Sequence, residues 1–212
     1  DEGESPIHYA SSLKQGIVDP DTSLKIAYKP QYIKYDKDTP MFQILQKIKT
    51  SSSFDSQYKK RILNSFNLNL LEDRTLGELS GGELQKVAIA DCLTTEADIY
   101  LLDEPSAFLD VNMRLTVASV LRRSIESINK AAFVVEHDIV TQDFISDSLI
   151  IFDGEPGIHG KSSPPQSLRD GMNSFLKNMD ITFRRDQTTG RPRVNKKGSR
   201  LDKMQRKIGE YY

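Results

Sequence analysis

Two adjacent carboxylates and one histidine are the residues whose types and places in the chain first suggest chemistry. Asp103 and Glu104 come directly after the apolar run "IYLL", and His137 lies just beyond a second apolar run, "AFVV". An aspartate at the end of a strand can hold Mg²⁺, and a glutamate beside it can polarise an attacking water. A histidine at the same edge can contact a phosphate or orient that water. On its own, this pattern indicates solvated acids at a strand end and a structural histidine more often than phosphate chemistry.

The stretch "LSGGE" (79–83) predicts the beginning of a helix, for which there are two interpretations. Ser80 and Glu83 have the spacing of a capping box, which any helix can use. Gly81 and Gly82 argue for more than a cap, because each glycine weakens a helix by roughly 1 kcal/mol relative to alanine. Without Cβ atoms, the backbone N–H groups at the positive end of a helix are open to an anion. We therefore expect either a plain capping box or an anion site.

Three short apolar runs that end in charged residues predict the sheet that positions these side chains. The runs lie in 97–105, 130–138 and 147–157. An amphipathic helix is predicted over 111–129, between the first two. Continuous apolar runs are typical of parallel strands covered on both faces, and their alternation with helices indicates a doubly wound α/β fold. Because ligands bind beyond the carboxyl ends of such strands, Glu104 and His137 are expected at one edge of the sheet.

The chain before these runs has a different pattern. Residues 24–31, "LKIAYKPQ", alternate in polarity up to a proline and predict a strand followed by a loop. From about 39 to 78 the apolar spacing is helical, with a loop over 51–56, and residues 1–23 are turn-rich. The predicted buried positions of the helices are Phe42, Leu45, Ile48, Ile62, Leu63 and Phe66.

Composition and charge exclude several classes of protein. The 212 residues are 37% hydrophobic and 28% charged, as in ordinary globular domains. No run of 18 apolar residues occurs, so no membrane span is predicted, and the acidic first ten residues do not resemble a secretory signal. Because the sequence does not begin with methionine, we expect a fragment of a longer protein. The single cysteine, Cys92, excludes an internal disulfide and is expected to pack in the core.

The net charge of −1 is distributed unevenly, because the C-terminal tail is strongly basic. Between Arg184 and Tyr212, ten basic residues oppose three acidic ones. A basic tail on an acidic body is a candidate for contact with a polyanion. A solvated, partly disordered tail is an equal alternative.

Four motifs are more specific in their order than any of them alone. The segments "KPQ" (29–31), "LSGGE" (79–83), "IYLLDEPSAFLD" (99–110) and "VVEHD" (134–138) resemble, in this order, the motifs of the ATP-binding cassette (ABC) ATPase domain. The resemblance implies the α/β fold of an ABC-type P-loop ATPase core, with a mostly parallel sheet, flanking helices and an inserted helical subdomain. It also implies that ATP and Mg²⁺ are bound.

The resemblance assigns a role to each residue that matches a motif. Glu104 would be the catalytic glutamate, and His137 the switch histidine that acts with it. Asp103, the Walker B aspartate, and Gln31, the Q-loop glutamine, would hold the metal, and Gln31 would also reach the attacking water. The residues implied to contact the nucleotide are Gln31, Ser80, Gly81, Gly82, Glu83 and the D-loop aspartate Asp110.

A narrower resemblance comes from other segments. The stretch "DEPSAFLD" (103–110) differs from the "DEPTNHLD" typical of ABC-F translation factors. Near the C-terminus, "FLKNMDITFRRD" (175–186) and "RPRVNK" (191–196) resemble the second nucleotide-binding domain of the ABC-E subfamily. Members of this subfamily use ATP-driven closure of two domains to split ribosomes into subunits. The likeness covers nearly all of the chain, and its clearest departure is 5–23, a segment longer than the family's usual link.

Membership in that subfamily would imply partners, a compartment and a missing element. The partners would be the first nucleotide-binding domain of the same parent chain, the ribosomal small subunit with its rRNA, and release and initiation factors. The protein would act in the cytoplasm and would not bind a membrane. Iron–sulfur clusters would belong only to an N-terminal domain of the parent. The sequence has no Walker A loop, the element that grips the phosphates, so the chain alone is expected to be inactive. In this family the signature motif of one domain covers the ATP held by the Walker A loop of the other domain. A chain with a signature motif but no Walker A loop therefore carries half of a nucleotide site.

The motifs divide the chain into four predicted parts. These are 1–35, the end of the N-terminal part of the core with the Q-loop strand; 36–95, the helical subdomain; 96–180, the α/β core; and 181–212, a basic hinge or tail. Within the tail, 183–197 is predicted to be an ordered hinge whose Arg184 and Arg185 pair with carboxylates of the partner domain. The run from Lys196 onward is the candidate for rRNA contact.

Three other classes of protein remain open on the sequence. The ATPase subunit of a membrane transporter would share every motif up to His137, and the "FRRD…RPR" tail argues against it. A non-enzymatic interaction module that has lost its nucleotide site would be distinguished by the sequence upstream of Asp1. A DNA-repair ATPase is disfavoured because no long heptad coil flanks the motifs.

Overall fold

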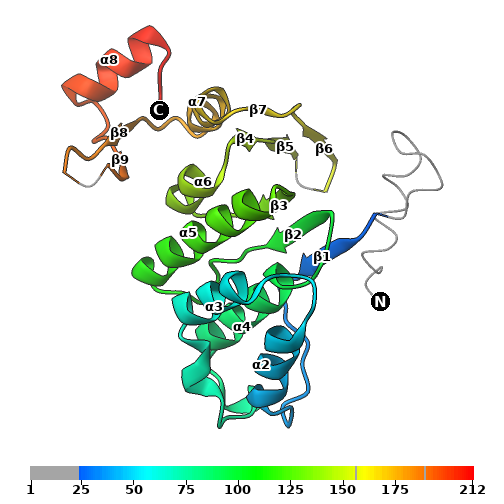
Figure 1. The fold of residues 1–212 in the computed structure, drawn as a ribbon. Coiled ribbons are helices and arrows are strands. Elements are labelled where there is room, and N and C mark those ends of the chain that lie inside the picture. Colours follow the sequence, from blue (N-terminus) through cyan, green and yellow to red (C-terminus); the bar gives the residue numbers. More distant parts are fainter. Residues whose placement is uncertain (1–23, 156, 189) are drawn as a thin grey trace. The chain divides into compact units, whose positions relative to one another are not determined.

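The computed structural model describes residues 24–155, 157–188 and 190–212. They belong to two compact units, which divide in the sequence between Thr141 and Gln142 (Figure 1). The turn-rich segment predicted over 1–23, with its departure from the family's usual link, lies outside the described residues. The four-part division predicted from the motifs stays a prediction.

The helical part of the first unit follows the predicted spacing. Its elements are α2 (Met41–Thr50), α3 (Ser56–Ser65), η1 (Leu68–Leu71) and η2 (Leu76–Glu78). α3 begins where the Asp55 carboxylate accepts a backbone N–H of the first turn at 2.8 Å, a side-chain cap. One predicted core position was wrong, because Phe42 is 47% exposed and Met41 is buried instead. Positions 41, 45 and 48 have the spacing of one helix face. The confirmed core positions are Leu45, Ile48, Ile62, Leu63 and Phe66.

The first unit also contains a three-stranded parallel sheet. The strands, in spatial order, are β1 (Ile26–Lys29), β2 (Ile99–Asp103) and β3 (Ala131–Val135). α4 (Gly81–Leu93) packs on β1 and β2, and α5 (Val111–Ile128) connects β2 to β3 (Figure 1). The predicted α/β fold with a parallel sheet and flanking helices is confirmed. Among the described helices, none combines the length and apolar character needed to cross a bilayer.

The single cysteine lies in α4 and packs in the core, as predicted. Cys92 is 5% exposed and free. Burial raises the pKa of its thiol to about 12, because the thiolate is poorly solvated there. Cys92 is therefore a packing residue rather than a reactive one.

The two faces of the sheet differ in burial within the described part of the chain. Tyr100 and Leu102 are buried on one face. On the other, Tyr28, Phe133 and Val135 are 41%, 53% and 55% exposed. Successive strand residues point to opposite faces, so a continuous apolar run supplies two apolar faces. The prediction of strands covered on both faces holds, among the described residues, for one face only.

The third apolar run does not join the sheet, and its prediction as a parallel strand was wrong. Residues 147–157 instead contribute β4 (Ser148–Leu149) and β5 (Phe152–Glu155) in the second unit. β4 pairs antiparallel with β7 (Gln166–Ser167), and β5 forms an antiparallel hairpin with β6 (His159–Ser162). Gly154 has a φ of 147°, and a Cβ on it would lie 2.2 Å from the carbonyl oxygen of His159. Such close pairing is open only to glycine, so Gly154 permits the hairpin.

The C-terminal tail is folded. It follows α7 (Leu168–Asn178), and its elements are the antiparallel pair β8 (Phe183–Arg185) and β9 (Pro192–Val194), and α8 (Arg200–Ile208). The Asp202 carboxylate, almost fully buried, accepts the N–H of Gly198 and the hydroxyl of Thr182, both at 2.7 Å, and Nε of Arg206 at 2.9 Å. These bonds, the first above all, hold the pKa of Asp202 below its usual value. The alternative of a partly disordered tail is wrong for the described residues.

The last residues of the chain are held in the second unit by backbone bonds. The Asn173 side-chain oxygen accepts the N–H of Tyr211 at 2.7 Å and of Tyr212 at 2.9 Å. The carbonyl of Tyr211 in turn accepts the N–H of Phe183 at 2.7 Å. α6 (Ile139–Ile145) spans the division between the units and carries Asp143.

Candidate active site

Glu104 is the side chain on which the predicted catalytic residues converge. Its carboxylate oxygen Oε1 accepts a hydrogen bond from Gln31 Nε2 at 2.8 Å and lies 3.0 Å from His137 Nε2. Since a carboxylate oxygen only accepts, a proton on Nε2 of His137 completes the second contact. The His137 side chain is 78% exposed and that of Glu104 is 23% exposed. The structure therefore gathers an amide, a carboxylate and an imidazole at one accessible point.

These three residues meet because they follow three neighbouring parallel strands. Gln31 comes shortly after β1, Glu104 directly after β2, and His137 shortly after β3. The carboxyl ends of parallel strands share an edge, which is where ligands bind in such sheets. The N–H of Glu104 donates to the carbonyl of Val135 at 2.9 Å and extends the pairing of β2 and β3 by one bond. Glu104 then turns away with a φ of 44°, a left-handed conformation uncommon for residues with a side chain.

A further carboxylate at this edge, that of Glu136, was missed from the sequence. It accepts the backbone N–H of Ser106 at 3.3 Å, of His137 at 2.9 Å and of Asp138 at 3.2 Å. It thereby ties the segment that carries His137 to the segment that follows Glu104. Its position beside the histidine in "VVEHD" was the only signal, and nothing in the sequence separates such an acid from a solvated one.

The side-chain oxygen atoms at this edge of the sheet are chemically suited to bind a magnesium nucleotide. Gln31 turns its amide nitrogen toward Glu104, which leaves the amide oxygen as an uncharged ligand for a metal. Asp103, the last residue of β2, adds a carboxylate. Mg²⁺ prefers oxygen ligands and usually keeps several waters, so two protein donors suffice. Which residues contact the metal and the nucleotide stays a prediction.

Ser80 and Glu83 form the capping box that the sequence offered as one interpretation. Ser80 Oγ accepts the N–H of Glu83 at 3.3 Å, and the Glu83 carboxylate accepts the N–H of Ser80 at 2.8 Å and its hydroxyl at 2.7 Å. The backbone bond from Ser80 is the main reason why the pKa of Glu83 lies below its usual value. Arg74 pairs with the same glutamate at 3.3 Å. The cap explains these two residues without a ligand, and it leaves the anion site a prediction.

The two glycines of the signature lie against Phe108. A Cβ on Gly82 would be 3.0 Å from the carbonyl oxygen of Phe108 and 3.4 Å from Cδ2 of Leu109. A Cβ on Gly81 would lie 3.5 Å from the Phe108 side chain, an ordinary contact. Phe108 itself has a φ of 62° and is 74% exposed. Packing alone thus disfavours a Cβ at 82 but not at 81.

This difference predicts opposite effects of two neighbouring substitutions. Gly82→Ala is expected to lower the free energy of unfolding by about 1–3 kcal/mol, because the methyl group meets a backbone carbonyl that cannot yield easily. Gly81→Ala, the matched control, gains helix propensity and is expected to be neutral or stabilising by up to about 1 kcal/mol. Urea unfolding of the two variants measures the difference. Equal effects at both positions would contradict the packing explanation.

Asp110 has a structural role that the sequence did not reveal. It is the N-cap of α5, where its Oδ1 accepts the N–H of Asn112 at 2.9 Å and of Met113 at 3.0 Å. Such a cap typically stabilises a helix by about 1 kcal/mol. The contact of Asp110 with a nucleotide stays a prediction.

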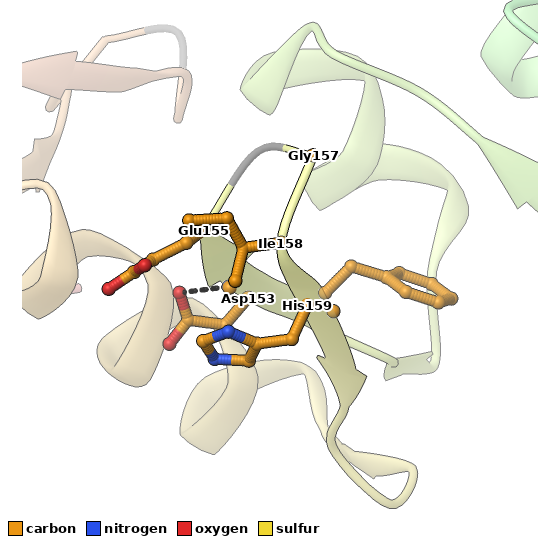
Figure 2. A pocket seen from close by; sticks show the side chains of 8 residues that line it. Asp153, Glu155, Gly157, Ile158 and His159 are labelled. Carbon is orange, nitrogen blue, oxygen red and sulfur yellow. Dashed lines mark hydrogen bonds between the residues drawn. The ribbon is translucent and has the colours of Figure 1, made fainter.

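A shallow hollow in the second unit lies apart in the sequence from all of these residues. It is lined by the β5–β6 hairpin, including Asp153, Glu155, Ile158 and His159 (Figure 2). The Asp153 carboxylate accepts the N–H of Gly154 at 2.8 Å and so serves the hairpin itself. None of the predicted site residues lines this hollow.

The chain has the α/β fold of an ABC ATPase domain, and its matches to known proteins are of the same class. The family described as ABC transporter matches residues 6–107, of which 6–23 lie outside the described part. An uncharacterised ABC transporter ATP-binding protein of Methanocaldococcus jannaschii is 53% identical over 207 residues, which are 94% of this chain and 34% of that protein.

Two further matches come from proteins of translation. The translation initiation factor rli1 of Schizosaccharomyces pombe is 42% identical over 197 residues, 90% of this chain and 32% of that protein. The archaeal ribosome recycling factor aABCE1, in its crystal structure with the ribosomal stalk protein aP1, has 47% sequence identity to this chain. The two structures superpose with a TM-score of 0.84, over 97% of this chain and 40% of that one. The chain spans about a third of the length of the curated relatives it matches.

Proposed function

We propose that the chain is part of the second nucleotide-binding domain of an ABC-E ATPase, which hydrolyses ATP to close two domains and split ribosomes. The convergence of Gln31 and His137 on the Glu104 carboxylate carries the proposal, because it orients a base for an attacking water at the edge where the motifs predict a nucleotide. The similarity to a ribosome recycling factor over 97% of the chain supports the biological role.

In the proposed reaction, Glu104 accepts a proton from the water that attacks the terminal phosphate. Gln31 and His137 hold its Oε1 atom, so the carboxylate cannot rotate freely away from that water. Asp103 and the amide oxygen of Gln31 would hold the metal. Mg²⁺, when bound with ATP, neutralises charge on the phosphates and orients them for in-line attack.

The signature residues serve a nucleotide held by the partner domain. The N-terminus of α4 carries the positive end of the helix dipole, and Gly81 there is exposed and has no side chain. Ser80 and Glu83 fix this terminus through the capping box, and Asp110 approaches the same nucleotide from the segment before α5. Because the chain has no Walker A loop of its own, we propose that it is inactive by itself.

The partners proposed for the whole protein follow from the subfamily. They are the first nucleotide-binding domain, the ribosomal small subunit with its rRNA, and release and initiation factors, in the cytoplasm. Lys196 and Arg200 are the proposed rRNA contacts, whereas Lys197 pairs with Asp180 at 2.9 Å within its own unit. Iron–sulfur clusters are proposed only for an N-terminal domain of the parent protein.

The experiment that tests this function compares the longer protein that contains this sequence with the present chain. Purified ribosomes are incubated with each in the presence of ATP, and the subunits are separated by sedimentation in a density gradient. The longer protein is expected to convert ribosomes into subunits only with hydrolysable ATP, and the present chain to do neither this nor ATP hydrolysis. ATP hydrolysis by the present chain that disappears on Glu104→Gln would contradict the proposal of a half site.

A further inference from the structure

Lys29 is a fully buried lysine that the proposed reaction does not use. It is the last residue of β1, pairs in register with Leu102, and is 1% exposed. Lysine is almost never buried to this extent without partners for its ammonium group. Burial lowers its pKa to about 8, against the opposing influence of Asp103, Glu104 and other nearby groups.

The partners of this ammonium group are the backbones of the two predicted catalytic acids. Lys29 Nζ donates to the carbonyl oxygen of Asp103 at 2.7 Å and to that of Glu104 at 3.2 Å. In an extended strand, successive carbonyls point to opposite sides, so one ammonium group cannot bind both. Here it binds both because the chain turns at Glu104, whose φ is 44°. The lysine and the left-handed turn therefore depend on each other.

The turn decides where the Glu104 side chain points. A residue with a side chain keeps a left-handed backbone only where its surroundings impose it. At Glu104 the surroundings are the N–H bond to Val135 at 2.9 Å, the N–H of Ala107 donated to the Glu104 carbonyl at 3.2 Å, and Lys29. From this backbone the carboxylate reaches both Gln31 and His137.

We propose that Lys29 is a positioning residue, whose ammonium group clamps the carbonyls of Asp103 and Glu104 and thereby aims the Glu104 carboxylate at Gln31 and His137. Lys29 touches neither nucleotide nor water and acts through Glu104. The link to catalysis rests on the function proposed above. The clamp itself is a property of the present chain and is tested on it.

A second buried lysine provides a matched control. Lys59 in α3 is 6% exposed, and its Nζ donates to two backbone carbonyls as well, those of Lys49 at 3.0 Å and Ser51 at 2.5 Å. It lies in the helical part, and none of its partners is a predicted site residue. Lys59→Met therefore reproduces the loss of a buried lysine that bridges two carbonyls, without touching the turn at Glu104.

The first measurement is nuclear magnetic resonance on the present chain labelled with ¹⁵N. In Lys29→Met, the backbone amide signal of Glu104 and the imidazole signals of His137 are expected to move, because the turn relaxes and the carboxylate leaves the ring. In Lys59→Met, both sets of signals are expected at their parental positions. Parental positions of the Glu104 and His137 signals in Lys29→Met would overturn the proposal.

A second variant covers the case in which Lys29→Met does not fold. The side chain of Lys29→Gln is shorter and cannot bridge both carbonyls, so the same two sets of signals are expected to move. If neither variant folds while Lys59→Met does, Lys29 is needed for folding as a whole and the positioning role is overturned.

The second measurement is steady-state ATP hydrolysis by the longer protein. Lys29→Met is expected to lower kcat roughly tenfold or more with little change in KM for ATP, since a small misplacement of a catalytic group costs rate rather than binding. Lys59→Met is expected to keep the parental kcat. An unchanged kcat in Lys29→Met, beside an active parent, would overturn the catalytic link. If the parent itself hydrolyses no ATP, the proposed function fails, while the resonance measurement still decides the clamp.

Discussion

Replacing Glu104 with glutamine in the longer protein is expected to lower the rate of ATP hydrolysis by about 10²–10⁴-fold while ATP binding is retained. The amide cannot accept the proton of the attacking water, and loss of a general base typically has an effect of this size. Because glutamine nearly matches the shape of glutamate, the contacts with Gln31 and His137 can persist. Single-turnover hydrolysis and equilibrium binding of a fluorescent ATP analogue measure the two properties separately.

Asp103→Asn is the matched control, because it changes the neighbouring acid in the same way. It is expected to weaken binding of the magnesium nucleotide, since the carboxylate proposed to hold the metal loses its charge. The assignment of roles would be wrong if Glu104→Gln lost nucleotide binding as completely as Asp103→Asn. It would also be wrong if both variants hydrolysed ATP at the parental rate.

Replacing Arg185 with alanine is expected to lower the stability of the second unit by about 1–3 kcal/mol, the cost of leaving a buried charged acceptor unsatisfied. Arg185 donates to both oxygens of the Asp143 carboxylate, at 2.8 and 2.7 Å. With the arginine in place, the Asp143 side chain is only 6% exposed, while that of Arg185 is 53% exposed. The guanidinium also stacks over the Tyr212 ring, 5.1 Å from its centre, and bonds the Tyr212 hydroxyl. Hydrogen exchange of the amides of 142–212 during urea unfolding measures the loss.

Arg184→Ala is the control for this substitution, on the neighbouring residue of the same strand. Arg184 is exposed and bonds Asn195 Oδ1 at 3.1 Å, so its removal is expected to change stability by less than about 0.5 kcal/mol. Equal effects of the two variants would show that the Asp143 pair does not stabilise the unit. The prediction from the sequence that both arginines pair with the partner domain is not supported for Arg185, whose carboxylate partner is in its own unit.

The sequence predicted the parts of the fold in which pattern and environment agree. The apolar runs before Asp103 and before His137 became paired parallel strands, and the helix between them formed as expected. The third run failed because four apolar residues in succession do not distinguish a sheet strand from a hairpin strand. The hairpin also needs the backbone of Gly154, with its φ of 147°. Local glycine conformation of this kind depends on the partner strand and is not encoded in periodicity.

The sequence predicted the reactive side chains of the site but not the contacts that hold them in place. Gln31, Glu104 and His137 carry recognisable side chains at motif positions, so their type and order were informative. Lys29 and Glu136 bind backbone groups of segments distant in the sequence, and such a long-range contact leaves no residue pattern by which it can be found. The caps made by Asp55 and Asp110 are local, but they were not predicted and appeared only with the structure.

The order of the strands in the first unit also bears on how the chain behaves at high concentration. Among the described residues, β1 and β3 form the two edges of the sheet. Such edges are where intermolecular sheet growth and domain swapping begin. The exposed Phe133 and Val135 on β3 add apolar contact to that edge. A formal net charge of −1 gives almost no long-range repulsion, so the colloidal stability of the chain depends on whatever covers β1 and β3.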